Sequence, residues 1–313
     1  MGIKVKNLYN IDSIVRAIET SKTFVGDAGI VLPRELEHIS TTIYEQQFAN
    51  LSFLSMSGIS VNNEGGVAET ITKIKKSING DFADAGNDSN TDGKISLSAQ
   101  SDTIPVNMKK ANSSWSEIEV QQAQLAGRNL TGDLLGAHNT RYNQQIDSRG
   151  YVGDGAEYDG LLNWSGFATT PATGVFSGLT PQQKYDDIKG LLDLQRAGVN
   201  LDPTFGASKI VLSPATYLSL NVILNTAAGP MSVRQALEMN ENVTFVITFR
   251  ASALGVMVAY SSDPLAMVMR IPTPLQISNI WQNGFDSNVD SLFRVGGLDV
   301  IENQSGYILT GVE

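Results

Sequence analysis

Apolar and polar positions alternate along a segment in the first third of the chain. From residue 95 the sequence reads ISLSAQ, and from residue 103 it reads TIPVNMK, so that every second side chain is apolar. A run rich in β-branched residues, VAETITKIKKSI, precedes them at 67–78. Period-two alternation is typical of strands that bury one face. Because residues 79–93 are almost all turn formers, the pattern predicts a ribbon of strands with a polar tip.

This ribbon is predicted to form most of an extended segment, residues 51–112. An isolated two-stranded ribbon is only marginally stable in water. We therefore expect the ribbon to lie on another molecule, and the natural candidate is a second copy of the chain.

Helical periodicity is clearest directly after the ribbon. Ser114 and Glu117 have the spacing of a capping box. A stripe of apolar residues follows at helical intervals: Ile118, Leu125, Leu130, Leu134, Tyr142 and Ile146. Glycines at 127, 132 and 136 weaken this helix by up to about 1 kcal/mol each. The pattern predicts one long helix, Ser114–Arg149, in a region at 113–165 that ends in a glycine-rich loop.

Shorter elements fill the region at 166–260. Helices are predicted to start at Pro181, at Pro214 and after Ser232, where capping residues precede apolar stripes. Strands are predicted at 209–212, 243–249, 255–260, 265–271 and 293–300. The first 50 residues carry two short amphipathic stripes, which predict an arm that does not fold alone. The mixture predicts an α+β fold, closed by strands within 261–313.

Composition narrows the functional classes. The 313 residues include 42% hydrophobic residues, enough for a substantial core, and carry a net charge of −10. Sequence-independent DNA binding needs a basic surface, so DNA is expected to be at most enclosed, not specifically bound. The absence of cysteine excludes disulfides and thiolate chemistry. The first twelve residues do not resemble a signal peptide, and no apolar run suits a membrane span.

One candidate metal-binding motif lies at the polar tip of the ribbon. Asp88, Asn90 and Asp92, followed by Gly93, match the first positions of a calcium-binding loop. Ala99 occupies the position where such a loop has a bidentate acid. Turn formation explains the same residues without a metal. No metal or cofactor is predicted, and a calcium-binding surface or adhesion module stays an alternative function.

Candidate catalytic residues are few. His38 and His138, the two histidines of the chain, have no serine or aspartate at a suggestive spacing. Asp154, Glu157 and Asp159 lie among glycines, as ordinary loop residues do. The chain contains no phosphate-binding loop, zinc-protease or nucleophile-elbow motif. We therefore expect a protein that is not an enzyme, without catalytic or cofactor-binding residues.

The order of these elements resembles a known family. The long helix is followed by GYVGDGAEYDGLLN (150–163), and KIVLSPATYLSL (209–220) leads from a strand through Ser-Pro into a helix. This order resembles the tailed-phage major capsid fold, the HK-ninety-seven-type fold that encapsulins share. The resemblance implies an N-terminal arm at 1–50, an extended hairpin at 51–112, a spine helix and loop at 113–165, an axial domain at 166–260 and C-terminal strands at 261–313.

The resemblance implies a structural subunit that assembles with itself into an icosahedral shell of pentamers and hexamers around the phage genome. Scaffold, portal and decoration proteins are implied as further partners. The implied location is the virion, after assembly in the cytoplasm of the host bacterium. An encapsulin-like compartment, whose hairpin is usually shorter, stays an alternative function.

Some family members cross-link lysine to asparagine. Lys73, Lys75, Lys76 and Lys94 lie in the hairpin segment. Lysines on an exposed edge strand also protect against aggregation, so these residues do not by themselves predict cross-linking.

Overall fold

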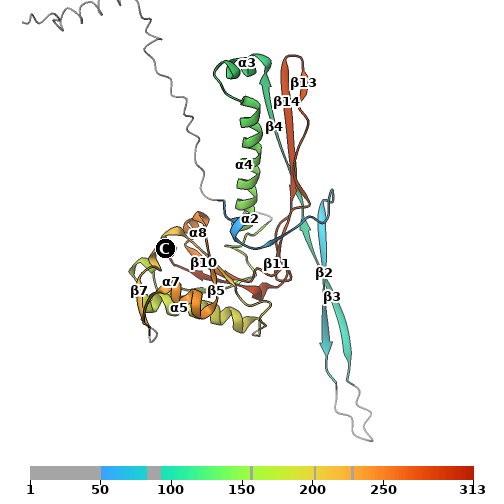
Figure 1. The fold of residues 1–313 in the computed structure, drawn as a ribbon. Coiled ribbons are helices and arrows are strands. Elements are labelled where there is room, and N and C mark those ends of the chain that lie inside the picture. The colour runs from blue at the N-terminus through green and yellow to red at the C-terminus, as the bar shows by residue number, and fades with distance from the viewer. Residues whose placement is uncertain (1–50, 83–92, 156–157, 201, 227–228) are drawn as a thin grey trace, which may run out of the picture. The chain divides into compact units, whose positions relative to one another are not determined.

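The computed structural model describes residues 51–82, 93–155, 158–200, 202–226 and 229–313, all of which belong to the compact unit Ala49–Glu313 (Figure 1). The predicted arm, with both of its amphipathic stripes, lies outside the described residues. The described part contains helices together with several sheets, which confirms the predicted α+β class.

A five-stranded sheet forms the centre of the α/β region, in the order β5-β16-β10-β6-β9. Its strands are β5 (Ala168–Pro171), β6 (Lys209–Leu212), β9 (Thr244–Ile247), β10 (Val256–Tyr260) and β16 (Gly306–Thr310). Strand β10 runs antiparallel to both β6 and β16. Because successive side chains of a strand point to opposite faces, Ile210 and Leu212 enter one core while Val211 enters another.

The helices of this region are α5 (Pro181–Gly198), α6 (Pro214–Ser219), α7 (Val233–Glu241) and α8 (Phe249–Leu254). The first three, α5 to α7, begin where the sequence predicts, whereas α8 has no counterpart in the prediction. Thr180 and Ser232 form capping boxes with the glutamines three residues later, and Ser213 caps α6. Helix α5 supplies Leu191 and Leu192, and helix α7 supplies Leu237, to the core that contains Ile210 and Leu212.

The opposite face of the sheet packs against the short helix α2 (Phe53–Met56) and the end of α4 (Leu130–Tyr151). The ring of Phe53 meets the ring of Tyr151 edge to face, with 5.1 Å between centroids. Tyr260 donates a hydrogen bond of 2.7 Å to the Ser57 carbonyl. Burial raises the pKa of Tyr260 well above its usual value, so burial favours the protonated phenol that donates this bond.

A second sheet is built around another long strand pair. Strand β4 (Asn107–Ser116) pairs antiparallel with β14 (Asp286–Val295) along its whole length. The other neighbours of β14 are β12 (Thr273–Ile277) and β13 (Trp281–Asn283). Tyr142 of α4 packs edge-on against Phe293 of β14, with 5.0 Å between ring centroids, so α4 and this strand pair share one core.

The single helix predicted from Ser114 to Arg149 is wrong. Strand β4 continues to Ser116, and two helices follow, α3 (Glu117–Leu125) and α4. Pairing with β14 holds residues 114–116 in extended form, which moves the capping box to Ser116 and Glu119. Gly127, at φ +72°, adopts a left-handed conformation between the two helices.

Other predicted boundaries also shift. Residue 249, predicted at the end of a strand, begins α8 because Thr248 caps that helix. The strand predicted at 293–300 is two strands, the end of β14 and β15 (Gly297–Val300), and Gly297 has φ +83° at the break. Strands β11 (Met267–Arg270) and β1 (Ser60–Asn62) join β15 in a third sheet.

Two glycines of α4 provide a matched test of packing between α2 and α4. A Cβ atom on Gly150 would lie 2.4 Å from ring atoms of Phe53, whereas a Cβ on Gly136 would meet nothing within 4 Å. We expect Gly150→Ala to lower the free energy of unfolding by about 1–3 kcal/mol through overpacking. Gly136→Ala should raise it by about 0.5–1 kcal/mol. Urea denaturation of unassembled subunits measures both, and equal effects would contradict the close α2–α4 contact.

Candidate assembly surfaces

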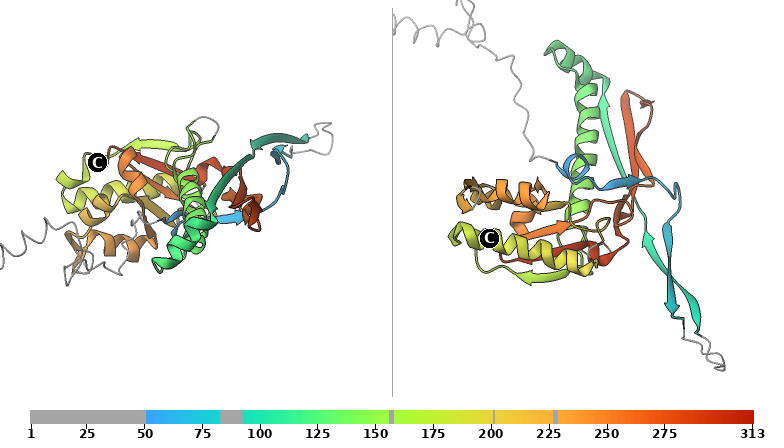
Figure 2. Two further views of the ribbon diagram at one scale, coloured as in Figure 1. Left: turned by 90° about the horizontal axis from the view of Figure 1, so that it is seen from above. Right: turned by 60° about the horizontal axis from the view of Figure 1, so that its bottom comes forward.

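The β2–β3 hairpin is the feature of the described chain that depends least on its own subunit. Strands β2 (Thr70–Gly80) and β3 (Ile95–Pro105) pair antiparallel, each over 11 residues. They form a separate two-stranded sheet, and in both figures the hairpin projects away from the other elements of the described unit (Figures 1 and 2).

The ribbon is shorter than the extended segment predicted at 51–112. Residues before it form α2 and β1, and β1 pairs with β11. The run predicted as one strand, TIPVNMK, divides at Val106, which is buried. Its first half ends β3, which pairs with β2, and its second half begins β4, which pairs with β14 from Asn107 onward.

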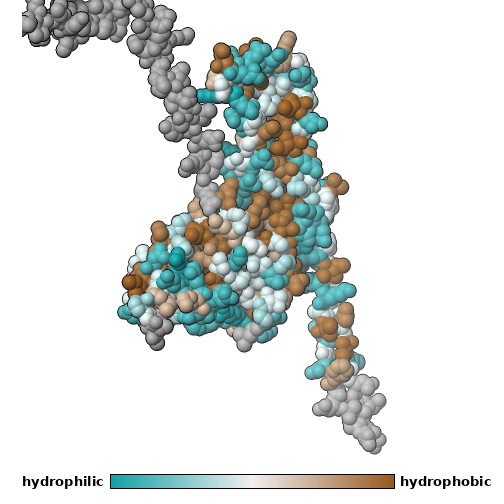
Figure 3. All heavy atoms as spheres, in the orientation of Figure 1, coloured by the Kyte–Doolittle hydropathy of each residue, from teal (hydrophilic) through white to brown (hydrophobic). Residues whose placement is uncertain are grey.

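The two faces of the hairpin differ in character. We call "outer face" the side that carries Ile74, Ile78, Ile95 and Leu97. These four side chains are 53–74% exposed in the subunit. The opposite face is polar there, with Ser77 and Ser98 joined by a hydrogen bond of 2.5 Å. Figure 3 shows hydrophobic residues on the hairpin interleaved with hydrophilic ones.

Near the base of the hairpin the apolar side changes face. Ile71 and Ile104 are cross-strand partners, half-buried, and belong to the face opposite the outer face. Ile71 lies against Gly65, and Ile104 lies against Gly296. The base therefore packs on its own subunit, whereas the distal part presents apolar side chains to solvent. The spacing of three between Ile71 and Ile74 is the sequence signal of this change, since a uniform strand keeps a period of two.

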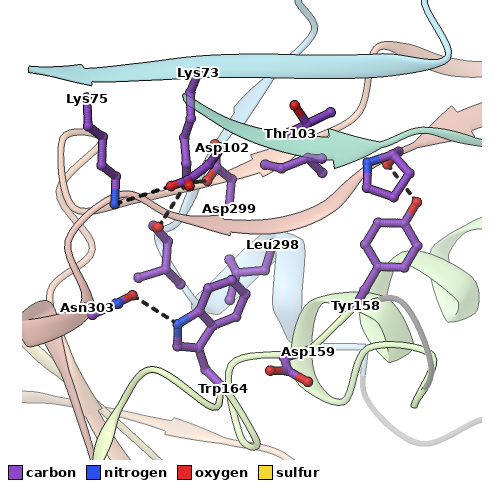
Figure 4. Close-up of a pocket in the computed structure, with 13 residues that line it drawn as sticks. Lys73, Lys75, Asp102, Thr103, Tyr158, Asp159, Trp164, Leu298, Asp299 and Asn303 are labelled. Carbon is purple, nitrogen blue, oxygen red and sulfur yellow. Dashed lines mark hydrogen bonds and ion pairs between the residues drawn. The ribbon is translucent and has the colours of Figure 1, made fainter. Parts of the chain in front are cut away.

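An ion cluster ties the base of the hairpin to the third sheet (Figure 4). The Lys73 ammonium pairs with Asp299, whose side chain is completely buried, and donates to the Val300 carbonyl at 3.1 Å. Arg270 binds the same carboxylate at 3.1 Å and reaches Glu64 with its other nitrogen, also at 3.1 Å. A buried carboxylate is costly unless cations compensate it, so Lys73 and Arg270 together stabilise this junction.

A cavity of about 460 Å³ lies between the hairpin base and the loop that follows α4. Tyr158 donates a hydrogen bond of 2.6 Å to the Pro105 carbonyl, and Trp164 donates one of 3.2 Å to Asn303 (Figure 4). Asp159 accepts from the Ser165 amide at 3.0 Å. These contacts hold the loop in place.

The acids and histidine considered for catalysis take structural positions. Asp154 pairs with Arg149 at 3.3 Å, and Glu157 lies outside the described residues. His138 is buried between Ser113 (2.9 Å) and Ser291 (2.7 Å), which joins α4 to β4 and β14. His38 also lies outside the described residues.

The calcium-like residues Asp88, Asn90 and Asp92 lie outside the described part of the chain. Within the described ranges, no group of three or more His, Asp or Glu side chains is arranged to hold a metal ion. Among the described helices, none combines the length and apolar character that a bilayer span requires.

Comparison with known proteins shows which family has this architecture. A family model described as "Major capsid protein" matches residues 83–312. The solved structure "The capsid of Myoviridae Phage XM1" is 43% identical, covers 91% of this chain and 100% of its own, and superposes with a TM-score of 0.83. The chain belongs to the major capsid protein family. The resemblance inferred from element order is thereby confirmed, and this major capsid protein is a structural component of a tailed-phage virion.

More distant structures share the fold alone. "Capsid of native GTA particle computed with C5 symmetry" is 14% identical, with a TM-score of 0.64 over 90% of this major capsid protein and 95% of that chain. The "virus-like particle from Pyrococcus furiosus" is 12% identical, with a TM-score of 0.51 over 82% and 92% of the two chains. Among curated proteins, none matches this chain.

Variants of two lysines in β2 test whether the ion cluster at the hairpin base contributes to stability. We expect Lys73→Met to lower the free energy of unfolding by about 1–3 kcal/mol, because Asp299 loses a charged donor. Lys75→Met is the control, since Lys75 lies 3.8 Å from Asp102 across an exposed pair, and its loss should cost less than about 0.5 kcal/mol. Urea denaturation compares the two variants, and a difference below the error of the measurement would contradict the role of Lys73.

Proposed function

We propose that this major capsid protein builds an icosahedral shell of pentamers and hexamers, in which each β2–β3 hairpin lies across a neighbouring subunit. The observation that carries the proposal is the outer face of the hairpin. Its isoleucines and leucine have neighbours across the ribbon but no covering layer from the described part of their own subunit. A second copy of the chain would provide that layer in every subunit of a shell at once.

Burial of apolar area on the outer face would stabilise the contact between subunits. Burial of an exposed aliphatic side chain contributes about 1.5–3 kcal/mol. The outer face offers Ile74, Ile78, Ile95 and Leu97 to a neighbour. The change of apolar face near Ile71 supports the same assignment. Only the base of the hairpin is built to pack on its own subunit, so the distal part is available to a second one.

The regions of the chain receive family roles within this proposal. They are an arm at 1–50, an extended hairpin region at 51–112, a peripheral region at 113–165, an axial domain at 166–260 and C-terminal strands at 261–313. The axial domain would meet its copies around the five- and six-fold axes. Scaffold, portal and decoration proteins would be the further partners, and assembly would take place in the cytoplasm of the host bacterium.

The packaged genome is proposed to be enclosed without specific binding, since the chain carries a net charge of −10. A wall of that charge attracts phosphates only at local basic sites. We also propose that the protein has no enzymatic activity. His138 is engaged in hydrogen bonds that join α4 to β4 and β14, and Asp159 accepts a hydrogen bond within the glycine-rich loop.

The outer face can be tested with two cross-strand pairs. Ile78→Thr with Leu97→Thr keeps residues that favour strands but removes apolar area, so we expect the subunit concentration needed for shells to rise about tenfold or more. Ser77→Thr with Ser98→Thr changes the opposite face and should assemble like the unmodified protein. Light scattering measures assembly, negative-stain microscopy identifies closed particles, and circular dichroism verifies folding.

Two results would count against this scheme in different ways. Normal assembly of the Ile78→Thr, Leu97→Thr variant would show that the outer face is not buried in the shell. A stable, folded monomer of the unmodified protein at all concentrations would overturn the shell proposal itself.

A further inference from the structure

A basic groove of about 620 Å³ lies where α4 ends beside β4 and the glycine-rich loop. Four cationic side chains line it, Lys109, Arg141, Arg149 and Arg250, whereas Asp154 is the one acid among its described lining residues. This concentration of positive charge stands out in a chain with a net charge of −10. Cations gathered in a hollow attract anionic groups more strongly than the same cations scattered over a surface.

Arg149 differs from an ordinary surface cation because its side chain is buried at the groove. Its side chain is only 7% exposed, its Nη2 atom pairs with Asp154 at 3.3 Å, and its guanidinium lies 4.7 Å from the centroid of the Tyr158 ring. Its Nη1 atom is buried and has no hydrogen-bond partner among the described residues. Buried charged donors are normally satisfied, so the Arg149 guanidinium has a donor that the described part of its own subunit leaves unused.

The remaining cations are held at the groove by different contacts. Arg250 donates to the buried Asp147 at 2.6 Å, and Arg141 donates to the Gln144 side chain at 3.0 Å. Lys109 enters from β4, on the strand that pairs with β14. The groove therefore collects charge from three separate elements, α4, α8 and β4.

The tip of the hairpin has the complementary charge. Residues 79–93 contain four aspartates, at 81, 84, 88 and 92, and no lysine or arginine. Strand β2 alone spans about 36 Å at about 3.3 Å per residue, and the described part of the hairpin projects away from α4 (Figure 1). A second copy of the chain is consequently the molecule whose tip can approach this groove.

We propose that the basic groove is the docking site for the acidic hairpin tip, residues 79–93, of a second copy of this chain. The inference rests on the proposed shell function and names the surface on the neighbour that the hairpin meets. Carboxylates and guanidinium groups form charge-assisted hydrogen bonds, frequently bidentate, which set register as well as affinity. Burial of the apolar outer face would then contribute most of the binding free energy, while the contact between tip and groove would fix the position of each hairpin.

Charge reversal in the full-length protein tests this assignment. The groove variant combines Lys109→Glu with Arg141→Glu, and the tip variant combines Asp84→Lys with Asp88→Lys. We expect each variant to raise the subunit concentration required for shells about tenfold or more. A protein that carries all four changes should assemble within about threefold of the unmodified protein, because opposite charges face each other again.

A matched control changes the same amount of charge outside the groove. Lys110→Glu with Arg128→Glu alters a residue on the opposite face of β4 and an exposed residue between α3 and α4. This control should assemble within about threefold of the unmodified protein. Light scattering at several salt concentrations measures all variants, and added salt should weaken assembly of the unmodified protein more than that of the groove variant.

Three results would overturn the proposal. In the first, the protein with all four changes requires a subunit concentration for shells that is raised by the product of the two factors measured for the groove and tip variants. In the second, the groove variant assembles like the control. In the third, the groove variant assembles normally but binds a labelled double-stranded DNA oligonucleotide more weakly in fluorescence anisotropy, which would assign the groove to nucleic acid. Absence of shells from the unmodified protein would instead be a failure of the shell function.

Discussion

A two-stranded ribbon cannot cover its own faces, and this constraint organises the rest of the molecule. Pairing between β2 and β3 satisfies the backbone groups that face each other, but it leaves the side chains of Ile74, Ile78 and Leu97 exposed. Hydrophobic burial is the dominant favourable contribution to association as well as to folding. A single subunit therefore pairs the two strands without covering their apolar face, and in the proposed shell a second copy would supply the missing layer.

The body of the protein gives the hairpin a rigid base. Asp299 is completely buried and joins Lys73 of β2 to Arg270 of β11, and Asp147 joins Arg250 of α8 to α4. Each carboxylate links elements that are distant in sequence, and removal of a single partner leaves a buried charge uncompensated. Such junctions favour one discrete orientation of the hairpin over many, because a displaced hairpin would separate the charges.

Local signals predicted much of this architecture. Capping residues located the starts of α5, α6 and α7, because a cap is a contact within one turn. Alternation at 95–100 correctly placed apolar side chains on one face of β3. Long-range pairing was beyond such signals. Residues 114–116 have a helix-like context but are held in a strand by β14, more than half of the chain away, and the Lys73–Asp299 pair joins residues that are 226 positions apart. The basic groove also arises only when three elements come together.

The change of apolar face between Ile71 and Ile74 has an evolutionary consequence. At the base, Ile71 and Ile104 need only remain compatible with residues of the same chain. In the proposed shell, each substitution on the outer face toward the tip would also change a contact surface of every identical neighbour. Mutations there act many times over in one particle, so the distal ribbon and the surface that receives it are expected to drift together, while the base drifts with its own core.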